Sequence, residues 1–296
     1  MSWHHGAVKN LPVLLLSVLL LSSCATLAQL PASLARPPDE SPHWDAVARG
    51  VDYSVFVSTG PRVDARALRV NLSAEGLVPV VTPGSGGMTK SQFVSSFARL
   101  YGCAAAVNTA PFRPASAVEG EPREVVGLTI AGGVVVSPPV APMAVLLLRR
   151  AEDGGLRAQI VLQTPGLERS REGGPIVAAA GGFTIVLSEG KPMADNRRRE
   201  PRTAAGVSAD GRTLYLLVAD GRRPGSAGLT DYETGLWLAR LGADRGMTLD
   251  GGGSSAMALR GADGIVRIVN VPIHGGTPGR ERAVGSCLGF QAASLP

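Results

Sequence analysis

The sequence predicts a single α+β domain, mostly β, with a few helices packed on mixed or antiparallel sheets. Its 296 residues are 45% hydrophobic but only 4% aromatic, which favours a large aliphatic core. Short runs rich in Val, Leu and Ala alternate with turns that contain Gly and Pro, a pattern typical of β-strands. Only two stretches place apolar residues at helical spacing.

The expected elements follow one another without an internal repeat or linker, so residues 50–291 are predicted to form one domain. Strands are expected at residues 53–57, 67–72, 103–107, 125–130, 134–136, 145–148, 158–162, 176–180, 183–187, 203–207, 214–218, 247–249, 256–259, 266–269 and 284–290. Gly181-Gly182 and Asp210-Gly211 are expected to form hairpin turns. Thr89 is expected to cap one helix that follows it, and a second helix is expected from Leu229 to Leu241, ending at Gly242.

The N-terminus has the pattern of an export signal. Lys9 precedes an apolar run from Leu11 to Leu21, which is too short to span a membrane. Cys24 ends a segment resembling a bacterial lipobox, so we predict a lipoprotein signal peptide at residues 1–24. The alternative is an ordinary signal peptide cleaved near Ala25 or Ala28.

Residues 25–49 are rich in Pro, Ser and Ala and are predicted to be a flexible tether. Ala25 is not the Asp that retains enterobacterial lipoproteins at the inner membrane. For a Gram-negative host, we therefore expect the lipid to anchor the protein to the outer membrane, facing the periplasm.

Two cysteines remain after Cys24, namely Cys103 and Cys287. An oxidising compartment would allow them to form a disulfide, although two buried free thiols fit the sequence as well. The formal net charge of +5 comes from scattered arginines rather than a basic block with aromatics, so nucleic-acid binding is not expected. The positive charge fits an anionic substrate or surface.

The run from Thr248 to Met257 is the strongest local sign of a site. Asp250 ends a short apolar segment and is followed at once by three glycines and two serines. Glycine allows close approach to the main chain, and successive N–H groups in such a turn can bind an anion. A plain glycine-rich turn is the alternative interpretation.

Several motifs occur in a recognisable order. They are residues 107–112 (VNTAPF), 201–206 (PRTAAG), 218–222 (VADGR), 228–243, 249–255 (LDGGGSS) and 281–284 (ERAV). On these motifs the chain resembles the phosphodiester glycosidase family from about Gly50 to Phe290. The family includes an animal enzyme that removes N-acetylglucosamine from a sugar-1-phosphodiester. The resemblance implies hydrolysis of an anomeric C–O bond, with a phosphorylated glycan or glycosyl phosphodiester as substrate.

The chain departs from the family pattern near Asn108. Residues 108–112 read Asn-Thr-Ala-Pro-Phe where the family usually has Asn-Gly-Gly-Phe-Phe. Ala256 stands in place of a usual Thr, and Thr248 in place of a usual Asn. The loss of two glycines changes how closely the backbone can approach a ligand at this loop.

The expected chemistry needs a carboxylate at the sugar and donors for the phosphate. Asp250 and Glu233 are the catalytic candidates, because one ends a strand and the other begins a helix. Arginine forks suit phosphate oxygens. The substrate-binding candidates are Asn108, Arg202, Thr203, Asp220, Gly221, Arg222, Gly251, Gly252, Gly253, Ser254, Ser255 and Arg282.

His274 is the single histidine inside the expected fold, and proton transfer is one role considered for it. No cofactor is required by the sequence. Asp220, Glu233 and Asp250 would suit a divalent cation such as Ca²⁺ if they converged. Whether Asp250 attacks, takes a proton or holds a metal stays open here. The alternatives are a hydrolase that cleaves an ordinary glycoside or a P–O bond, and a non-catalytic glycan-binding lipoprotein involved in exopolysaccharide handling.

Overall fold

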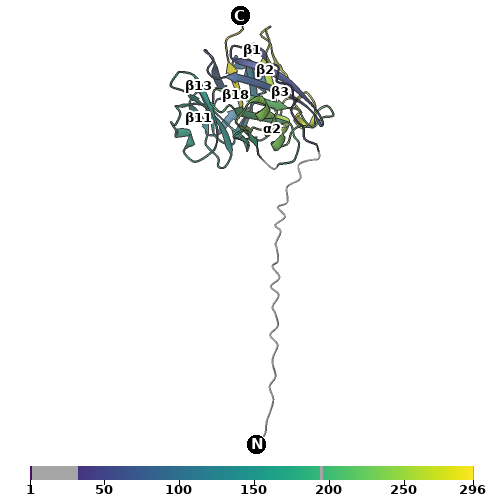
Figure 1. Ribbon diagram of the computed structural model, residues 1–296. Coiled ribbons are helices and arrows are strands. Elements are labelled where there is room, and N and C mark those ends of the chain that lie inside the picture. The colour runs from purple at the N-terminus through teal and green to yellow at the C-terminus, as the bar shows by residue number, and fades with distance from the viewer. Residues whose placement is uncertain (2–32, 194–195, 296) are drawn as a thin grey trace. The chain divides into compact units, whose positions relative to one another are not determined.

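The computed structural model describes Met1, residues 33–193 and residues 196–295 (Figure 1). The predicted signal peptide, Cys24 and most of the expected tether lie outside these residues. No helix in the described part of the chain is long and apolar enough to cross a membrane.

The largest sheet has eight antiparallel strands in the order β1-β2-β3-β18-β17-β19-β15-β16. Its strands are β1 (Asp45–Ala48), β2 (Val51–Thr59), β3 (Arg62–Asn71), β15 (Ile185–Ser188), β16 (Lys191–Pro192), β17 (Arg202–Val207), β18 (Thr213–Ala219) and β19 (Arg245–Thr248). β17 and β18 form the hairpin expected at Asp210-Gly211. β17 and β19 lie side by side, so the residues after β19 emerge next to the start of β17.

Two five-stranded antiparallel sheets face this one. The first has the order β11-β10-β14-β12-β13, with β10 (Thr129–Ala131), β11 (Val134–Ser137), β12 (Ala144–Arg150), β13 (Leu156–Leu162) and β14 (Ile176–Gly181). The second has the order β21-β20-β7-β22-β4, with β4 (Val78–Val81), β7 (Ala105–Asn108), β20 (Met257–Arg260), β21 (Val266–Ile268) and β22 (Cys287–Gln291). A small fourth sheet contains β5 (Gly84–Ser85), β6 (Met88–Lys90), β8 (Phe112–Arg113) and β9 (Pro122–Val125).

The main core lies where these sheets meet. Leu68 and Leu216 come from the eight-stranded sheet, Leu146 from β12, and Val107 and Phe290 from the third sheet, and all five are buried. Burial of such aliphatic side chains is the main stabilising term for the fold. The mostly-β prediction with few helices is therefore confirmed.

Two helices cover outer faces of the sheets. α2 (Asp231–Leu241) packs Trp237 and Leu238 on the face of the large sheet opposite the main core (Figure 1). Its start is fixed by a capping box, in which Thr230 and Glu233 each accept a hydrogen bond from the other's backbone N–H. α1 (Val94–Leu100) packs Phe97 against the third sheet.

Two local expectations are wrong. Gly181-Gly182 is not a hairpin turn, because β14 and β15 belong to different sheets and the glycines carry the chain between them. A Cβ on Gly182 would come within 2.3 Å of the Thr248 carbonyl oxygen, so this crossing requires glycine. Thr89 lies in β6 and does not cap α1, whose N-cap is Phe93.

The described part of the expected tether is packed on the domain. Asp45–Ala48 form strand β1, and the Ala35 side chain is fully buried against α2. The Ala35 N–H donates to Glu233 Oε1 (2.7 Å), and Trp237 Nε1 donates to the Ala35 carbonyl (2.7 Å). Residues ahead of Gly50 therefore contribute contacts to the folded domain.

Cys103 and Cys287 do not form a disulfide but are buried free thiols. Cys103 Sγ lies beside Gly289, two residues further along β22 than Cys287. Burial raises the pKa of Cys103 to about 12 and also raises that of Cys287, so both thiols stay protonated.

Candidate active site

Asp250 lies two residues beyond the end of β19, and its backbone is held on both sides. Its N–H donates to the Thr109 carbonyl (2.7 Å), and its own carbonyl accepts from Asn108 Nδ2 (2.6 Å). The carboxylate side chain therefore projects from a fixed point of the main chain. The residue as a whole keeps partial solvent exposure.

Asn108 and Thr203 help to hold the backbone of Asp250 in place. Both are fully buried, and the Thr203 hydroxyl donates to Asn108 Oδ1 (2.7 Å). The same oxygen accepts from the Ala256 N–H (3.2 Å). These residues, predicted to contact substrate, instead join β7, β17 and the glycine turn beneath Asp250.

Burial raises the pKa of Asp250 to about 6, because desolvation penalises the carboxylate more than its surroundings stabilise it. A hydrogen bond from Ser254, the positive charge of Arg282 and the Gly251 N–H act in the opposite direction. A carboxylate with such a pKa is ionised at neutral pH and is suited to proton transfer there.

Three N–H groups of the glycine turn are already hydrogen-bonded within the fold. The Gly252 N–H donates to the Pro201 carbonyl (2.8 Å), and the Ser254 and Ser255 N–H groups bond to carbonyls within the turn. Gly252 has a positive φ of 61°, which favours glycine. The absent side chains instead let two arginines lie on the turn.

Arg282 and Arg222 occupy this surface. A Cβ on Gly253 would lie 2.5 Å from Arg282 Nη2, and one on Gly252 would lie 3.2 Å from Arg222 Nη2. The first spacing is shorter than any normal contact, so a side chain there must displace the guanidinium. The bare turn thus serves the close approach of cationic side chains rather than of a phosphate.

The three predicted arginines differ in how they are paired. Arg202 contacts Asp231 (2.9 Å) and donates to the Leu229 carbonyl, while Arg222 is paired with Glu200. Among the described residues, Arg282 has no carboxylate within ion-pair distance.

Instead, Arg282 donates from Nη1 to the Ser254 hydroxyl (3.1 Å) and from Nε to His274 Nδ1 (3.0 Å). Its positive charge is therefore the one most available to an anionic ligand. Ser254, predicted as a substrate donor, links Arg282 to Asp250, whereas Ser255 is buried with no hydrogen-bond partner for its hydroxyl in the described chain.

Glu233, the second catalytic candidate, is fully buried, and both of its carboxylate oxygens accept hydrogen bonds from the protein. Its carboxylate accepts from the Thr230 N–H, from the Ala35 N–H and from Arg199 (2.5 Å). These contacts hold the start of α2 and the N-terminal segment. Nothing in this arrangement presents Glu233 to a ligand beside Asp250.

Asp220 and Gly221 also have roles within the fold. The Asp220 carboxylate is buried and accepts from Asn270 Nδ2 and the Val271 N–H (3.0 Å each), and from Arg223. Gly221 packs so tightly that a Cβ would lie 2.7 Å from the Pro201 nitrogen. These contacts keep the Asp220 carboxylate within the fold, and in the described chain Asp220, Glu233 and Asp250 do not form a group that could hold a cation.

Across residues 33–193 and 196–295, no three His, Cys, Asp or Glu side chains are grouped so that they could hold a metal ion. The residues that sequence reasoning missed are Glu200 and Asp231, the partners of Arg222 and Arg202. Both lie among other charged residues with no local pattern that marks them.

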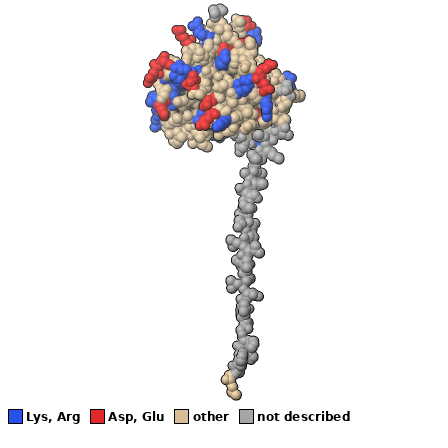
Figure 2. Space-filling model, viewed as in Figure 1, with Lys and Arg blue, Asp and Glu red and all other residues tan. Residues whose placement is uncertain are grey.

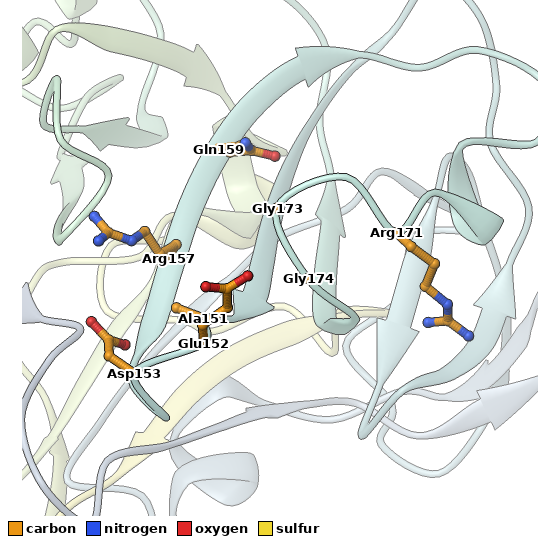
Figure 3. Close-up of a pocket in the computed structure, with 8 residues that line it drawn as sticks. All are labelled: Ala151, Glu152, Asp153, Arg157, Gln159, Arg171, Gly173 and Gly174. Atoms are coloured by element: carbon orange, nitrogen blue, oxygen red, sulfur yellow. The ribbon is translucent and has the colours of Figure 1, made fainter.

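A pocket of about 580 Å³ lies elsewhere, beside Asp153, Arg157 and Arg171 (Figure 3). It adjoins the Arg150 end of β12, whereas the Ala144 end is bonded to Phe183, whose N–H donates to the Thr248 carbonyl at the end of β19. Seven residues of strand, roughly 20 Å, separate these ends, so the pocket is distinct from the Asp250 site. On the face in Figure 2, basic and acidic side chains are interspersed without a broad patch of one sign.

Comparison with known proteins places this geometry in context. A family model described as phosphodiester glycosidase matches residues 101–291. A prophage-derived protein of Bacillus subtilis, YomE, is 39% identical over 82 residues, which are 26% of this chain. The chain spans only 13% of the length of that relative.

Two solved structures share the fold. The catalytic domain of zebrafish N-acetylglucosamine-1-phosphodiester α-N-acetylglucosaminidase, auto-inhibited by its pro-peptide, has a TM-score of 0.63 at 20% identity, over 86% of this chain and 88% of that one. A candidate exported protein of Burkholderia pseudomallei has a TM-score of 0.60 at 18% identity, over 79% and 74% of the two chains.

Proposed function

Because the chain belongs to the phosphodiester glycosidase family, we propose that it hydrolyses the bond between a sugar's anomeric carbon and a phosphodiester oxygen. The observation that supports this most is the pairing of Asp250 with Arg282 across Ser254. It places a carboxylate that is ionised near neutral pH close to a guanidinium that forms no direct ion pair with a carboxylate of the described chain. This combination suits a substrate in which a sugar contacts Asp250 and a phosphate contacts Arg282.

Asp250 acts as the general base in this proposal. It takes a proton from a water whose oxygen forms the new bond to the anomeric carbon. The C–O bond to the phosphate breaks, and its electron pair leaves with the phosphate oxygen. The products are a free reducing sugar and a phosphate monoester.

The leaving group explains why one free carboxylate is enough. A phosphate departs as a stable anion, so protonation by a second acid is not required. Arg282 stabilises the negative charge that develops on the phosphate, and Arg222 on the same glycine turn adds to the local positive charge. Glu233 is absent from the reaction because its carboxylate is buried in the contacts with α2 and Ala35.

The finer context is also proposed. An exported protein, lipid-anchored through Cys24, would meet sugar-1-phosphodiester linkages in envelope or extracellular glycans. The support is the N-terminal sequence pattern. Metabolic labelling with a palmitate analogue would show labelled wild-type protein and unlabelled Cys24→Ala; equal labelling of both would contradict the anchor.

The reaction is tested with α-N-acetylglucosamine 1-(methyl phosphate) in ¹⁸O water. We expect the label on the anomeric oxygen of the sugar and none on phosphate. Label on phosphate means P–O cleavage and contradicts the proposal, as does binding without turnover over a long incubation. Proton NMR of the first-formed anomer tests the base: inversion supports it, and retention shows that Asp250 attacks the sugar.

A further inference from the structure

His274 lies at the edge of the site, on a loop that packs against the glycine turn. It begins the short 3-10 helix η3 (His274–Gly276) and is partly buried. A Cβ on Gly253 would be 3.3 Å from the His274 Cα and 2.5 Å from Arg282 Nη2. His274 and Arg282 thus lie together over the same bare stretch of backbone.

The contact between them determines where the imidazole carries its proton. Arg282 Nε is a donor only, and it donates to His274 Nδ1 at 3.0 Å. Nδ1 must therefore accept, and it carries no proton. The proton of the neutral ring is left on Nε2, which has no hydrogen-bond partner in the described chain.

The surroundings keep the ring neutral. Burial lowers the pKa of His274, and the positive charges of Arg282 and Arg280 lower it further. The polar side chains of the neighbouring glycine turn are Ser254, whose hydroxyl accepts from Arg282 Nη1, and Asp250, whose charge acts on Arg282 without a direct hydrogen bond. A second proton on Nδ1 would meet the Arg282 N–H directly, so the ring is unsuited to the proton transfer considered from sequence.

Two free donors result at neighbouring positions. Arg282 uses Nε and Nη1 for His274 and Ser254, whereas Nη2 has no hydrogen-bond partner among the residues described. Nη2 and His274 Nε2–H therefore belong to adjacent side chains, one positive and one neutral. A phosphodiester has two non-bridging oxygens, which such a pair can satisfy without a second cation.

We propose that His274 is a neutral hydrogen-bond donor of the phosphate subsite, held in its Nε2–H form by Arg282. This rests on the proposed function, since it assigns the second donor to the phosphate of that substrate. The role is recognition of the diester oxygen rather than acid–base chemistry.

Two substitutions test the contributions of the two ring nitrogens separately. His274→Gln places an amide N–H near Nε2, while His274→Asn keeps an acceptor near Nδ1 for Arg282 and loses the outer donor. We expect kcat/KM on the methyl phosphodiester to fall about 10- to 100-fold in His274→Asn and to stay within about threefold of wild type in His274→Gln. Thermal unfolding of both variants checks that they fold.

The opposite ranking, or wild-type activity in both variants, overturns the proposal. Nitrogen-15 NMR of histidine-labelled wild-type protein provides a readout that needs no turnover. At pH 7 we expect the His274 signals of a neutral ring with a bare Nδ1 and a proton on Nε2, and a shift of the Nε2 signal with dimethyl phosphate. A protonated Nδ1, or no shift of the Nε2 signal with dimethyl phosphate, contradicts the inference about His274 even if the protein proves inactive. If the NMR result is as expected but the protein does not hydrolyse the substrate, only the proposed reaction is contradicted.

Discussion

Replacing Asp250 with asparagine should abolish hydrolysis and stabilise the protein. The folded-state pKa of Asp250 is about 6, against 3.8 for the ordinary group. At 1.36 kcal/mol per pH unit, ionising this carboxylate costs the folded protein about 3 kcal/mol relative to the unfolded chain. The neutral amide of Asp250→Asn would not carry that cost, which already allows for the attraction of Arg282. We therefore expect a gain of about 1–3 kcal/mol at pH 7.5.

The sign of the pH dependence follows from the raised pKa. Between about pH 4 and pH 6 the folded protein binds the proton that the unfolded chain has lost, so its stability falls as the pH rises through this range. The advantage of Asp250→Asn should therefore be fully present above pH 6 and shrink to about 1 kcal/mol or less at pH 4.5. Urea unfolding of both proteins at the two pH values measures this. An equal difference at both, or a less stable variant at pH 7.5, would refute the reasoning.

Three other changes test the remaining features. Gly253→Ala should lower kcat/KM at least tenfold while the melting temperature changes little, since the new Cβ displaces the flexible end of Arg282; wild-type kinetics would argue against a phosphate role for that guanidinium. Glu233→Gln removes the buried charge that pairs with the partly exposed Arg199, so urea unfolding should show a loss of about 1–3 kcal/mol while the folded fraction stays active; inactivity at unchanged stability would restore Glu233 as catalytic. Cys103 and Cys287 should react with a thiol reagent only after denaturation, and a melting temperature lowered by reductant would show a disulfide.

Much of the local structure could be predicted from the sequence. The alternation of apolar residues located most strands, and the Asp210-Gly211 turn located the β17–β18 hairpin. The helix ending at Gly242 was also found, because helical spacing and a terminal glycine are local signals. Gly181-Gly182 carried an equally good hairpin signal but joins two sheets, since strand partners are chosen by packing and not by the turn alone.

By itself, the sequence determined the mostly-β fold, the family and the position of Asp250 at a strand end, because each depends on residues close together in the chain. It did not distinguish Asp250 from Asp220 and Glu233, which also lie beside a glycine or at a helix start. Only the tertiary structure decided that the carboxylates of Asp220 and Glu233 are hydrogen-bonded within the fold. Their partners, Asn270 and Ala35, lie 50 and 198 residues away, and a buried carboxylate takes whichever donors the folded chain brings to it. Asp250, in contrast, keeps partial solvent exposure close to the positive charge of Arg282.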